Sequence, residues 1–541
     1  MKEFISLLRK PDNAIGATEQ SDFRFEEKAF EECPVKFDYI VGEKSAKVVV
    51  YPSGSPVKYL KLRFRGDNSF IDKVYGDQWA RACFNTALEW RSVVADRAMP
   101  WFTYVIGDNK MKCYGIKTGA DCFAMWYVDP AGITLFLNLT CDLRGTDLKE
   151  PLVACEVVEL EGAEGEDPYN VARKFSSVMC ENGVKPKTPI FGVNNWYWAY
   201  GNISHQSVLD ECDYLMEMTQ GCKNKPYMII DDGWQKFRKS LSGLDEGFYI
   251  GGPWSPNEKF PDMRDTADKI HAKGANAGIW FRPLLTRDDV SKEVIVAEEC
   301  NGLVMDVSHP YVLEKVEKDA SLLAKTYGFD LIKHDFSRQD AMGNSTWEHK
   351  ADMTKKGRKY FDNTKTTATH MKNLYKAIQK GAGSADVIGC DVFGHLSAGI
   401  HSVHRVGADT SGRSWEWTRS DGVNSVMRLP TNNIFYNVDP DCAAFTDLVD
   451  SGLNLDFLKM CALTSMTTLA SVTPHTLTKD ELKKINEIYR MADSAKYEYG
   501  IKNFDKNANP DTFVSPDGKV EEKFDWYRGY DGARTVLGWF N

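Results

Sequence analysis

The stretch DLIKHDF at residues 330–336 carries the pattern that decides the fold. A short apolar run ends in charged side chains, as a buried strand does where it leaves a sheet. The same pattern occurs in YMIIDDGW at 227–234 and in VIGCDVFG at 387–394. Between these runs the apolar residues recur at helical spacing, for example from Val208 to Met216, which follow Ser204, a residue type that caps the start of helices. The central part of the chain is therefore predicted to alternate strands with helices.

Eight such runs occur between residues 190 and 474. They are IFGVNNW (190–196), YMIIDDGW (227–234), ANAGIWFRP (275–283), DLIKHDF (330–336), VIGCDVFG (387–394), HRVGAD (404–409), NIFYNVD (433–439) and TLASVTP (468–474). Repeated βα units of this number and length predict an α/β fold, a (β/α)8 or TIM barrel. An open doubly wound sheet is the alternative, but the first run is not followed by the Gly-rich phosphate loop that such a sheet would need.

Both flanks of the predicted barrel have a different pattern. Residues 20–160 alternate polar and apolar positions between turn signals, which predicts an antiparallel β-sandwich. The prolines of KPKTP at 185–189 favour a boundary there, and the Gly- and Asp-rich tail from Tyr497 predicts a small β extension. We therefore expect a β-sandwich domain over 1–185, the barrel over 186–494 and the extension over 495–541.

Composition narrows the class of protein. The chain has 541 residues, of which 43% are hydrophobic and 27% charged, which is typical of a globular protein with a large core. A net charge of −10 argues against nucleic acid as a partner, and no stretch has the length of a membrane span. The 13 cysteines are odd in number and form no CxxC pair. With an N-terminus unlike a signal peptide, they favour a reduced, cytoplasmic compartment. The oligomeric state is left open.

Charged residues gather where the predicted strands end. In a TIM barrel the active site lies at the carboxyl ends of the strands. A single Asp at such a position often caps the next helix, but five ends with neighbouring Lys, Arg and Trp favour a shared site. The residues at these ends are Asp231 and Asp232, Lys333 and Asp335, Cys390 and Asp391, Arg405 and Asp409, and Asp439 and Asp441.

Two chemistries suit converging carboxylates. Hard metal ions take oxygen ligands, and glycoside hydrolysis uses two carboxyl groups that flank the scissile bond. Lys333 lies two residues before Asp335, so both side chains point to the same side of a strand, and an ammonium group favours the ionised carboxylate of a nucleophile. For a metal, His395, His401 and His404 with Cys390 and Asp391 form only a loose cluster, and a tight motif such as HExxH is absent. We expect no metal and no organic cofactor.

At these residues the chain resembles the clan D glycoside hydrolases, families 27 and 36, which include α-galactosidases and raffinose-synthase-like enzymes. YMIIDDGWQ at 227–235 is similar to the clan's second-strand motif, which implies that Asp231 and Asp232 bind the 4- and 6-hydroxyls of galactose. LIKHDF at 331–336 resembles the nucleophile strand, which implies Asp335 as nucleophile and Lys333 as a sugar contact.

Three further segments contribute to the resemblance. HRVGAD at 404–409 implies that Arg405 contacts the sugar and that Asp409 is the general acid/base. NNWYWAYG, with Trp196, and GIWFRP at 278–283 are similar to the first- and third-strand signatures. A β domain before the barrel fits family 36 better than family 27. Trp196 and Trp234 are the leading candidates for stacking on a sugar ring.

Two positions depart from the family 36 pattern. Arg282 stands where that family usually has an acid, and GCDVFG at 389–394 is nearer to the family 27 segment that contacts the sugar's 2-substituent. That likeness implies Cys390 and Asp391 beside the 2-position, where a carboxylate favours a free hydroxyl over an N-acetyl group. Arg282 is expected either to pair with Asp391 or to bind an acidic substituent.

The sequence thus predicts a retaining α-glycosidase that hydrolyses terminal α-galactosides of an oligosaccharide or glycoconjugate by double displacement. Two alternatives stay within the clan, an α-N-acetylgalactosaminidase and an α-galactosyl transglycosidase. An alternative of another class is a non-catalytic carbohydrate-binding barrel, although such a protein gains nothing from a nucleophile and an acid.

Overall fold

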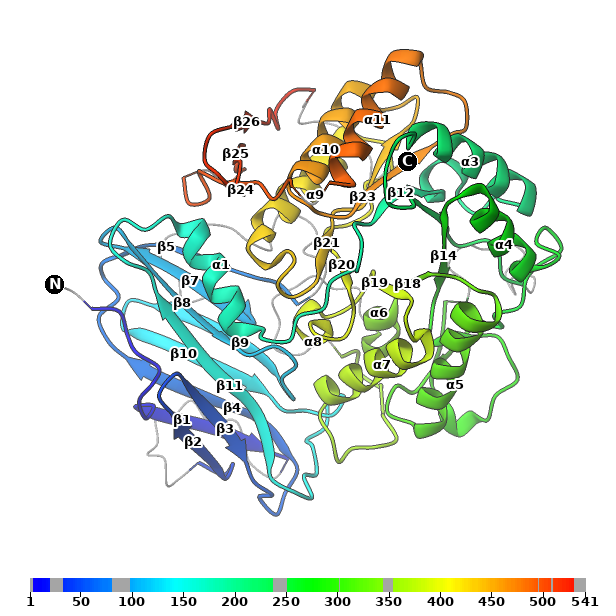
Figure 1. Cartoon of the computed structure of the whole chain (residues 1–541). Coiled ribbons are helices and arrows are strands. Elements are labelled where there is room, and N and C mark those ends of the chain that lie inside the picture. Colours follow the sequence, from blue (N-terminus) through cyan, green and yellow to red (C-terminus); the bar gives the residue numbers. More distant parts are fainter. Residues whose placement is uncertain are drawn as a thin grey trace.

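The computed structural model describes residues 3–19, 33–79, 98–236, 251–300, 302–343, 354–494, 496–506 and 509–529. Figure 1 shows antiparallel sheets formed by the N-terminal part of the chain, a parallel sheet ringed by helices, and a small sheet near the C-terminal end. None of the helices in these ranges has the length and apolar character needed to cross a bilayer.

Two antiparallel sheets form the N-terminal part. One has the order β1 (Asn13–Thr18), β4 (Val57–Arg65), β10 (Gly132–Asn138), β9 (Phe123–Asp129) and β6 (Met99–Pro100). The other has the order β2 (Phe37–Val41), β3 (Ser45–Val50), β11 (Leu152–Glu161), β8 (Lys110–Ile116), β7 (Phe102–Gly107) and β5 (Ile71–Gly76). Rings from the two sheets meet where Tyr114 of β8 lies 6.4 Å from Trp126 of β9. The sheets therefore pack as two layers around an apolar core.

The parallel sheet has nine strands, and its two edge strands are consecutive in the sequence. Its order is β21 (Asn437–Asp439), β20 (Val403–Arg405), β19 (Asp386–Gly389), β18 (Leu331–His334), β14 (Asn276–Phe281), β13 (Tyr227–Ile230), β12 (Phe191–Asn194), β23 (Thr468–Val472) and β22 (Cys442–Phe445). The two end strands are separated by Pro440 and Asp441 alone, so they act as two halves of one interrupted strand. One half pairs with β20 and the other with β23, which closes the ring as a barrel requires.

Each of the eight apolar runs overlaps one strand of this ring, and helices occupy the connections between them. They are α2 (Trp196–Ala199), α3 (His205–Met218), α4 (Met263–Lys273), α5 (Pro310–Ser321), α6 (Ser337–Met342), α7 (Thr367–Ala382), α8 (Gly394–Ser397), α9 (Trp415–Met427), α10 (Ser451–Leu463) and α11 (Lys479–Ala492). Ser204 caps α3, as predicted, while Pro310 opens α5 and Thr478 forms a capping box with Glu481 at the start of α11.

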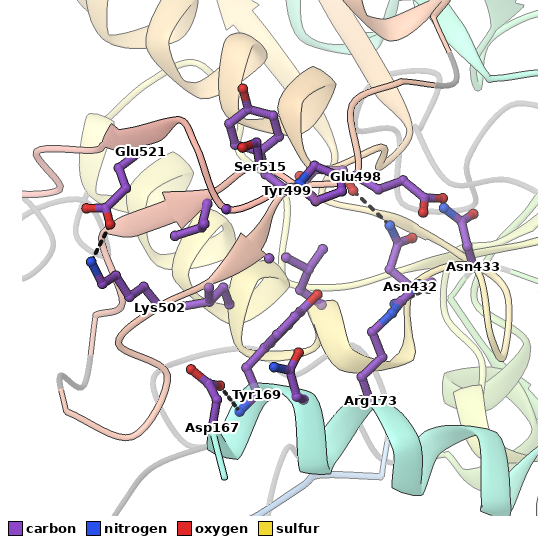
Figure 2. A pocket seen from close by; sticks show the side chains of 18 residues that line it. Asp167, Tyr169, Arg173, Asn432, Asn433, Glu498, Tyr499, Lys502, Ser515 and Glu521 are labelled. Carbon is purple, nitrogen blue, oxygen red and sulfur yellow. Dashed lines mark hydrogen bonds and ion pairs between the residues drawn. The ribbon is translucent and has the colours of Figure 1, made fainter. Parts of the chain in front are cut away.

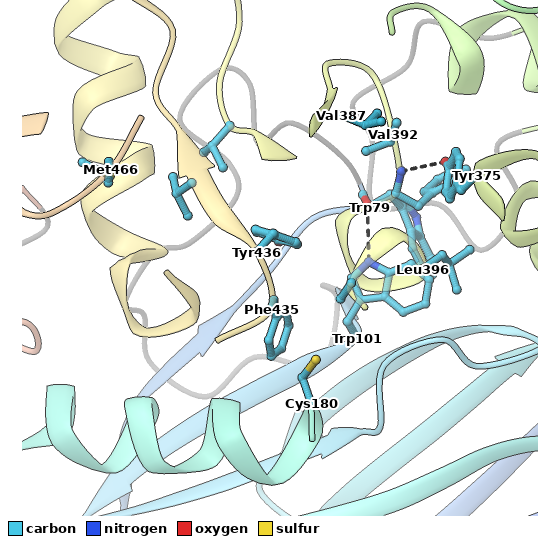
Figure 3. Close-up of a cluster of buried hydrophobic side chains, with 14 of the residues drawn as sticks. Trp79, Trp101, Cys180, Tyr375, Val387, Val392, Leu396, Phe435, Tyr436 and Met466 are labelled. Carbon is cyan, nitrogen blue, oxygen red and sulfur yellow. Dashed lines mark hydrogen bonds between the residues drawn. The ribbon is translucent and has the colours of Figure 1, made fainter. Parts of the chain in front are cut away.

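The barrel and the N-terminal sheets share a buried interface. Figure 3 shows Trp79 and Trp101 from the N-terminal part beside Phe435 and Tyr436, which lead into β21. The ring of Trp101 stacks on His395 of α8 at 4.9 Å, and Phe123 lies 4.8 Å from Phe393. Helix α1 (Pro168–Met179), which links the two parts, contacts β8 and β11. The barrel is thus packed against the N-terminal sheets through buried aromatic contacts.

Two small sheets lie outside the barrel ring, and the second falls within the stretch predicted as a small β extension. Strands β15 (Leu285–Thr286), β17 (Gly302–Met305) and β16 (Ile295–Glu299) form an antiparallel sheet after β14. Near the C-terminal end, β24 (Gly500–Ile501), β25 (Thr512–Val514) and β26 (Glu521–Lys523) form another.

A buried carboxyl group on α3 makes stability depend on pH. Glu211 is 1% exposed, and Trp198 Nε1 donates a 2.9 Å hydrogen bond to its Oε1. Burial raises the pKa of Glu211 to about 8, and the hydrogen bond from Trp198 opposes this only in part. The folded protein therefore holds this proton at pH values where the unfolded chain has released it.

We expect Glu211→Gln to flatten the dependence of unfolding free energy on pH. In the natural chain, the contribution of Glu211 to the free energy of unfolding is complete below the pKa that this residue has in the unfolded chain. The contribution falls as pH rises toward 8, by up to about 1.4 kcal/mol per pH unit. Urea unfolding between pH 5 and 8 measures the slope. Glu217→Gln, at an exposed position of the same helix, is the matched control. Equal slopes for the two variants would contradict the assignment.

Candidate active site

The carboxyl ends of the barrel strands hold a group of interacting charges. Lys333, inside β18, donates from Nζ to Asp231 Oδ2 across 2.7 Å, and Asn194 Nδ2 donates to the same oxygen across 2.8 Å. Burial opposes the charge of Lys333, but the carboxylates of Asp231 and Asp441 outweigh it, so its pKa lies well above the ordinary value. Lys333 is therefore a fixed cation at the base of the site.

Asp232 continues the turn after β13. Its Oδ1 accepts a 2.5 Å hydrogen bond from Gln235 Nε2, and its backbone N–H donates to Asp231 Oδ1 across 2.9 Å. Both carboxyl groups are almost completely buried, at 3% and 1% exposure. The pair predicted to bind sugar hydroxyls is thus held in a defined geometry beside Lys333.

Asp335 follows the last residue of β18 and is oriented by its neighbours. Its Oδ1 accepts a hydrogen bond from Phe336 N at 2.8 Å, and its Oδ2 lies 3.4 Å from Trp280 Nε1. Its own backbone N–H donates to Phe281 O of β14 across 3.0 Å. Phe336 has φ 59°, a left-handed conformation that is uncommon for a bulky residue. Strain of this kind is typical of functional sites, and here it allows the Phe336 N–H to reach the carboxylate.

Asp409 differs from Asp335 in its exposure. It lies four residues beyond Arg405, the last residue of β20, and accepts a hydrogen bond from Arg405 Nη2 at 3.1 Å. Its side chain is 44% exposed, whereas Asp335 is a buried residue. Because the strands are parallel, Asp335 and Asp409 lie at the same end of the barrel, with β19 between their strands. One carboxyl group is held in the floor and the other is open to solvent.

Asp441 is a site residue to which the sequence pattern gave no role. Its Oδ2 accepts hydrogen bonds from Arg405 Nη2 at 2.6 Å, from Thr410 N at 2.9 Å and from the hydroxyl of Tyr197. Burial disfavours its charge, but Arg405 and Lys333 more than compensate, so its pKa is lowered. Asp441 thus fixes both Arg405 and the segment that carries Asp409. The DPD at 439–441 was the only sequence signal for it.

Arg282 and Asp391 do not pair with each other, so this expectation was wrong. Arg282 donates from Nε and Nη2 to the two oxygens of Asp340, at 2.8 and 2.5 Å. Asp391 instead accepts from Arg338 Nε at 2.9 Å. Both arginines are bound to carboxylates of or beside helix α6, at exposures of 1% and 2%. The argument that Asp391 selects a free 2-hydroxyl loses its basis, because its Oδ1 accepts from Arg338 Nε and its Oδ2 accepts from Gln339 N–H at 3.1 Å.

The remaining predicted contacts are divided between the site and the core. Cys390 is fully buried, with Sγ 3.8 Å from Arg405 Nη1. Trp234 has no exposed surface, and its Nε1 donates to Trp280 O at 2.9 Å. This indole is therefore a core group, and the prediction that it stacks on a sugar ring was wrong. Trp196 is 5% exposed and lies 5.3 Å from the ring of Tyr200.

The histidines considered for a metal lie in separate packing environments. His395 contacts Ile116 O and Trp101, His401 packs on His334 at 4.9 Å, and His404 packs on Tyr436 at 4.7 Å. Across the described ranges no three His, Cys, Asp or Glu side chains are placed to hold a metal ion.

No family model and no curated protein sequence matches this chain. Solved structures do. The α-galactosidase TtGalA from Thermus thermophilus, in complex with p-nitrophenyl α-D-galactopyranoside, has 17% identity and a TM-score of 0.57, covering 90% of this chain and 98% of its own. The GH36 α-galactosidase AgaB from Geobacillus stearothermophilus has 15% identity and a TM-score of 0.60, covering 89% and 71%. An α-galactosidase from Lactobacillus brevis has 13% identity and a TM-score of 0.57, covering 87% and 67%.

These likenesses extend over both the antiparallel sheets and the barrel, since about nine-tenths of this chain is matched. At this level of identity they show the fold, a TIM barrel with an N-terminal β domain. What each side chain does in this chain rests on its own geometry.

Proposed function

We propose that this protein is a retaining glycoside hydrolase that acts on terminal α-galactosides, with Asp335 as nucleophile and Asp409 as general acid/base. The observation that carries the proposal is the arrangement of these two carboxyl groups at one end of the barrel, above the cations Lys333 and Arg405. The fold shared with proteins described as α-galactosidases supports the choice of substrate class.

The reaction proceeds in two displacements. Asp409 gives a proton to the glycosidic oxygen while Asp335 attacks the anomeric carbon, so the bond to the leaving oxygen breaks and the aglycone departs as an alcohol. Asp409, now a carboxylate, takes a proton from water as the water oxygen attacks the same carbon. The ester bond to Asp335 then breaks, and the sugar leaves with its original configuration.

The unequal exposure of the two carboxyl groups fits these roles. A nucleophile gains from a fixed position, which Phe336 N–H and Trp280 Nε1 provide for Asp335. An acid/base must meet both the leaving group and incoming water, and the half-exposed side chain of Asp409 is open to both.

The sugar is proposed to bind through the Asp231, Asp232 and Lys333 group, with Arg405 and Cys390 on the opposite side. These carboxylates accept hydrogen bonds from sugar hydroxyls, while Lys333 donates. Arg282 and Asp391 are left out of the proposal because each is paired within the protein.

The experiment that tests the function is a screen of aryl α- and β-glycosides, including galactosides and N-acetylgalactosaminides. We expect p-nitrophenyl α-galactoside to be hydrolysed best and NMR to show the α-anomer of galactose as the first product. No turnover of any α-glycoside, or a β-anomer formed first, would refute the proposal.

Asp441→Asn is expected to lower kcat by about 10- to 100-fold with a smaller change in KM. An amide at this position keeps the shape but removes the charge that holds Arg405, whose Nη2 also contacts Asp409. The loss acts through the acid/base, so the pH profile of kcat should change as well. Asp210→Asn, at an exposed position on α3, is the control. A fall in stability with unchanged kcat and pH profile would make Asp441 a purely structural residue.

A further inference from the structure

A cavity lies at the opposite end of the barrel from the proposed active site. It has a volume of about 570 Å³, within the range of roughly 300–1,000 Å³ that is usual for small-molecule sites. Figure 2 shows its three walls: helix α1, the segment at Asn432 and Asn433, and the small sheet with Lys502 and Glu521. Asn432 and Asn433 precede β21 and Thr464 precedes β23, so the cavity adjoins the amino ends of these strands.

We propose that this cavity is a second, non-catalytic site that binds a neutral saccharide. It is separate from the proposed catalytic centre because fully buried side chains fill the barrel between them. These are Ile229, Leu331, Ile388 and Val403, each without exposed surface. A ligand at one end therefore cannot extend through the barrel to the other.

The charges of the lining argue against an anionic ligand. Three acids, Asp167, Glu498 and Glu521, outnumber two bases, Arg173 and Lys502. Both cations already have acceptors: Lys502 is paired with Glu521, and Arg173 Nη1 donates to Asn432 O across 3.0 Å. A phosphate or carboxylate ligand would have to break these pairs and approach the carboxylates.

The uncharged part of the lining argues for a ligand rich in hydroxyl groups. Tyr169 extends from α1 into the space between the helix and the small sheet (Figure 2), and it is 8% exposed. Its hydroxyl lies within hydrogen-bonding reach of the Arg173 side chain, and its ring lies 6.1 Å from that of Phe504. Tyr499 and the amides of Asn170 and Asn433 complete this part of the lining.

A sugar matches this combination better than other neutral ligands do. Its hydroxyls both donate and accept hydrogen bonds, as carboxylates, amides and a phenol require, and its C–H faces pack on aromatic rings. A purely apolar ligand would leave the buried polar groups without partners, which costs about 1–3 kcal/mol for each.

The test uses sugars without galactose, so that it does not depend on the proposed function. Sucrose and maltose are titrated into the full chain and followed by saturation-transfer NMR and calorimetry. We expect saturable binding in the millimolar range. Asn170→Trp places a large ring at the cavity wall and should weaken binding by about tenfold or more. Ser177→Trp, at an exposed position further along the same helix, should leave it unchanged.

Tyr169→Phe is a second variant, which removes only the hydroxyl and should weaken binding a few-fold. Hydrolysis of p-nitrophenyl α-galactoside is measured alongside and should be equal in all four proteins. The proposal is overturned if neither sugar binds or if Asn170→Trp leaves sugar binding intact. It is also overturned if the natural chain binds inorganic phosphate instead of sugar and Asn170→Trp abolishes the binding of phosphate. A chain without hydrolytic activity that still binds sucrose or maltose here would refute only the catalytic assignment.

Discussion

Replacing Asp335 by Ala is expected to lower kcat on p-nitrophenyl α-galactoside by on the order of 10⁴-fold or more, because no covalent intermediate can form without the carboxylate. The substrate should still bind, since Asp231 and Lys333 are untouched. Steady-state kinetics and equilibrium binding of the substrate measure the two effects separately.

A small anion distinguishes the loss of a nucleophile from the loss of structure. The alanine variant leaves space on the face of the sugar opposite the leaving group, so added azide should restore turnover and give the β-galactosyl azide. Asp330→Ala removes a carboxylate just before the amino end of the same strand and should keep near-normal kcat. Near-normal hydrolysis by Asp335→Ala, or an α-galactosyl azide product, would exclude Asp335 as the nucleophile.

Asp409→Ala is expected to give the second largest effect, and its size should depend on the leaving group. Loss of a general acid costs about 10²- to 10⁴-fold, with the larger value for an alkyl galactoside such as raffinose, whose leaving oxygen needs a proton. p-Nitrophenolate leaves without protonation, so the aryl substrate should be less affected in its first step.

Azide should again report the role, with the opposite stereochemistry. In Asp409→Ala the glycosyl-enzyme on Asp335 still forms, and azide attacks it from the other face to give the α-galactosyl azide. A loss of activity that is equal for aryl and alkyl substrates, without azide rescue, would contradict the assignment of Asp409 as acid/base.

The strands and helix ends were accessible from the sequence because their signals are local. Each apolar run that ends in polar residues overlaps a strand of the ring, and Ser204 and Thr478 stand where capping side chains are needed. The second half of the interrupted strand, β22, was missed because CAAF at 442–445 is a short apolar run without alternation. Its assignment depends on pairing with β23, which is a long-range contact.

The pairing of buried charges could not be predicted for a similar reason. Asp340 and Asp391 are both possible partners for Arg282 and for Arg338. The spacing of residues in the sequence does not show which arginine pairs with which acid. The structure resolves the choice through the position of α6, whose start lies against Asp391 through Arg338 N and Ser337 Oγ. Trp234 shows that nearness in sequence does not place a side chain in the site. It lies two residues after Asp232, yet its side chain is buried in the core.

Asp441 lies in the interruption between β21 and β22, where its backbone and its side chain have different structural roles. Its backbone, at φ 71°, forms the joint where the ring closes, and its side chain anchors the Arg405 guanidinium, which also contacts Asp409. A substitution of Asp441 that changed the contact with Arg405 would also affect the closure of the barrel. Specificity is therefore expected to diverge through the loops around this joint, while the joint itself stays constant.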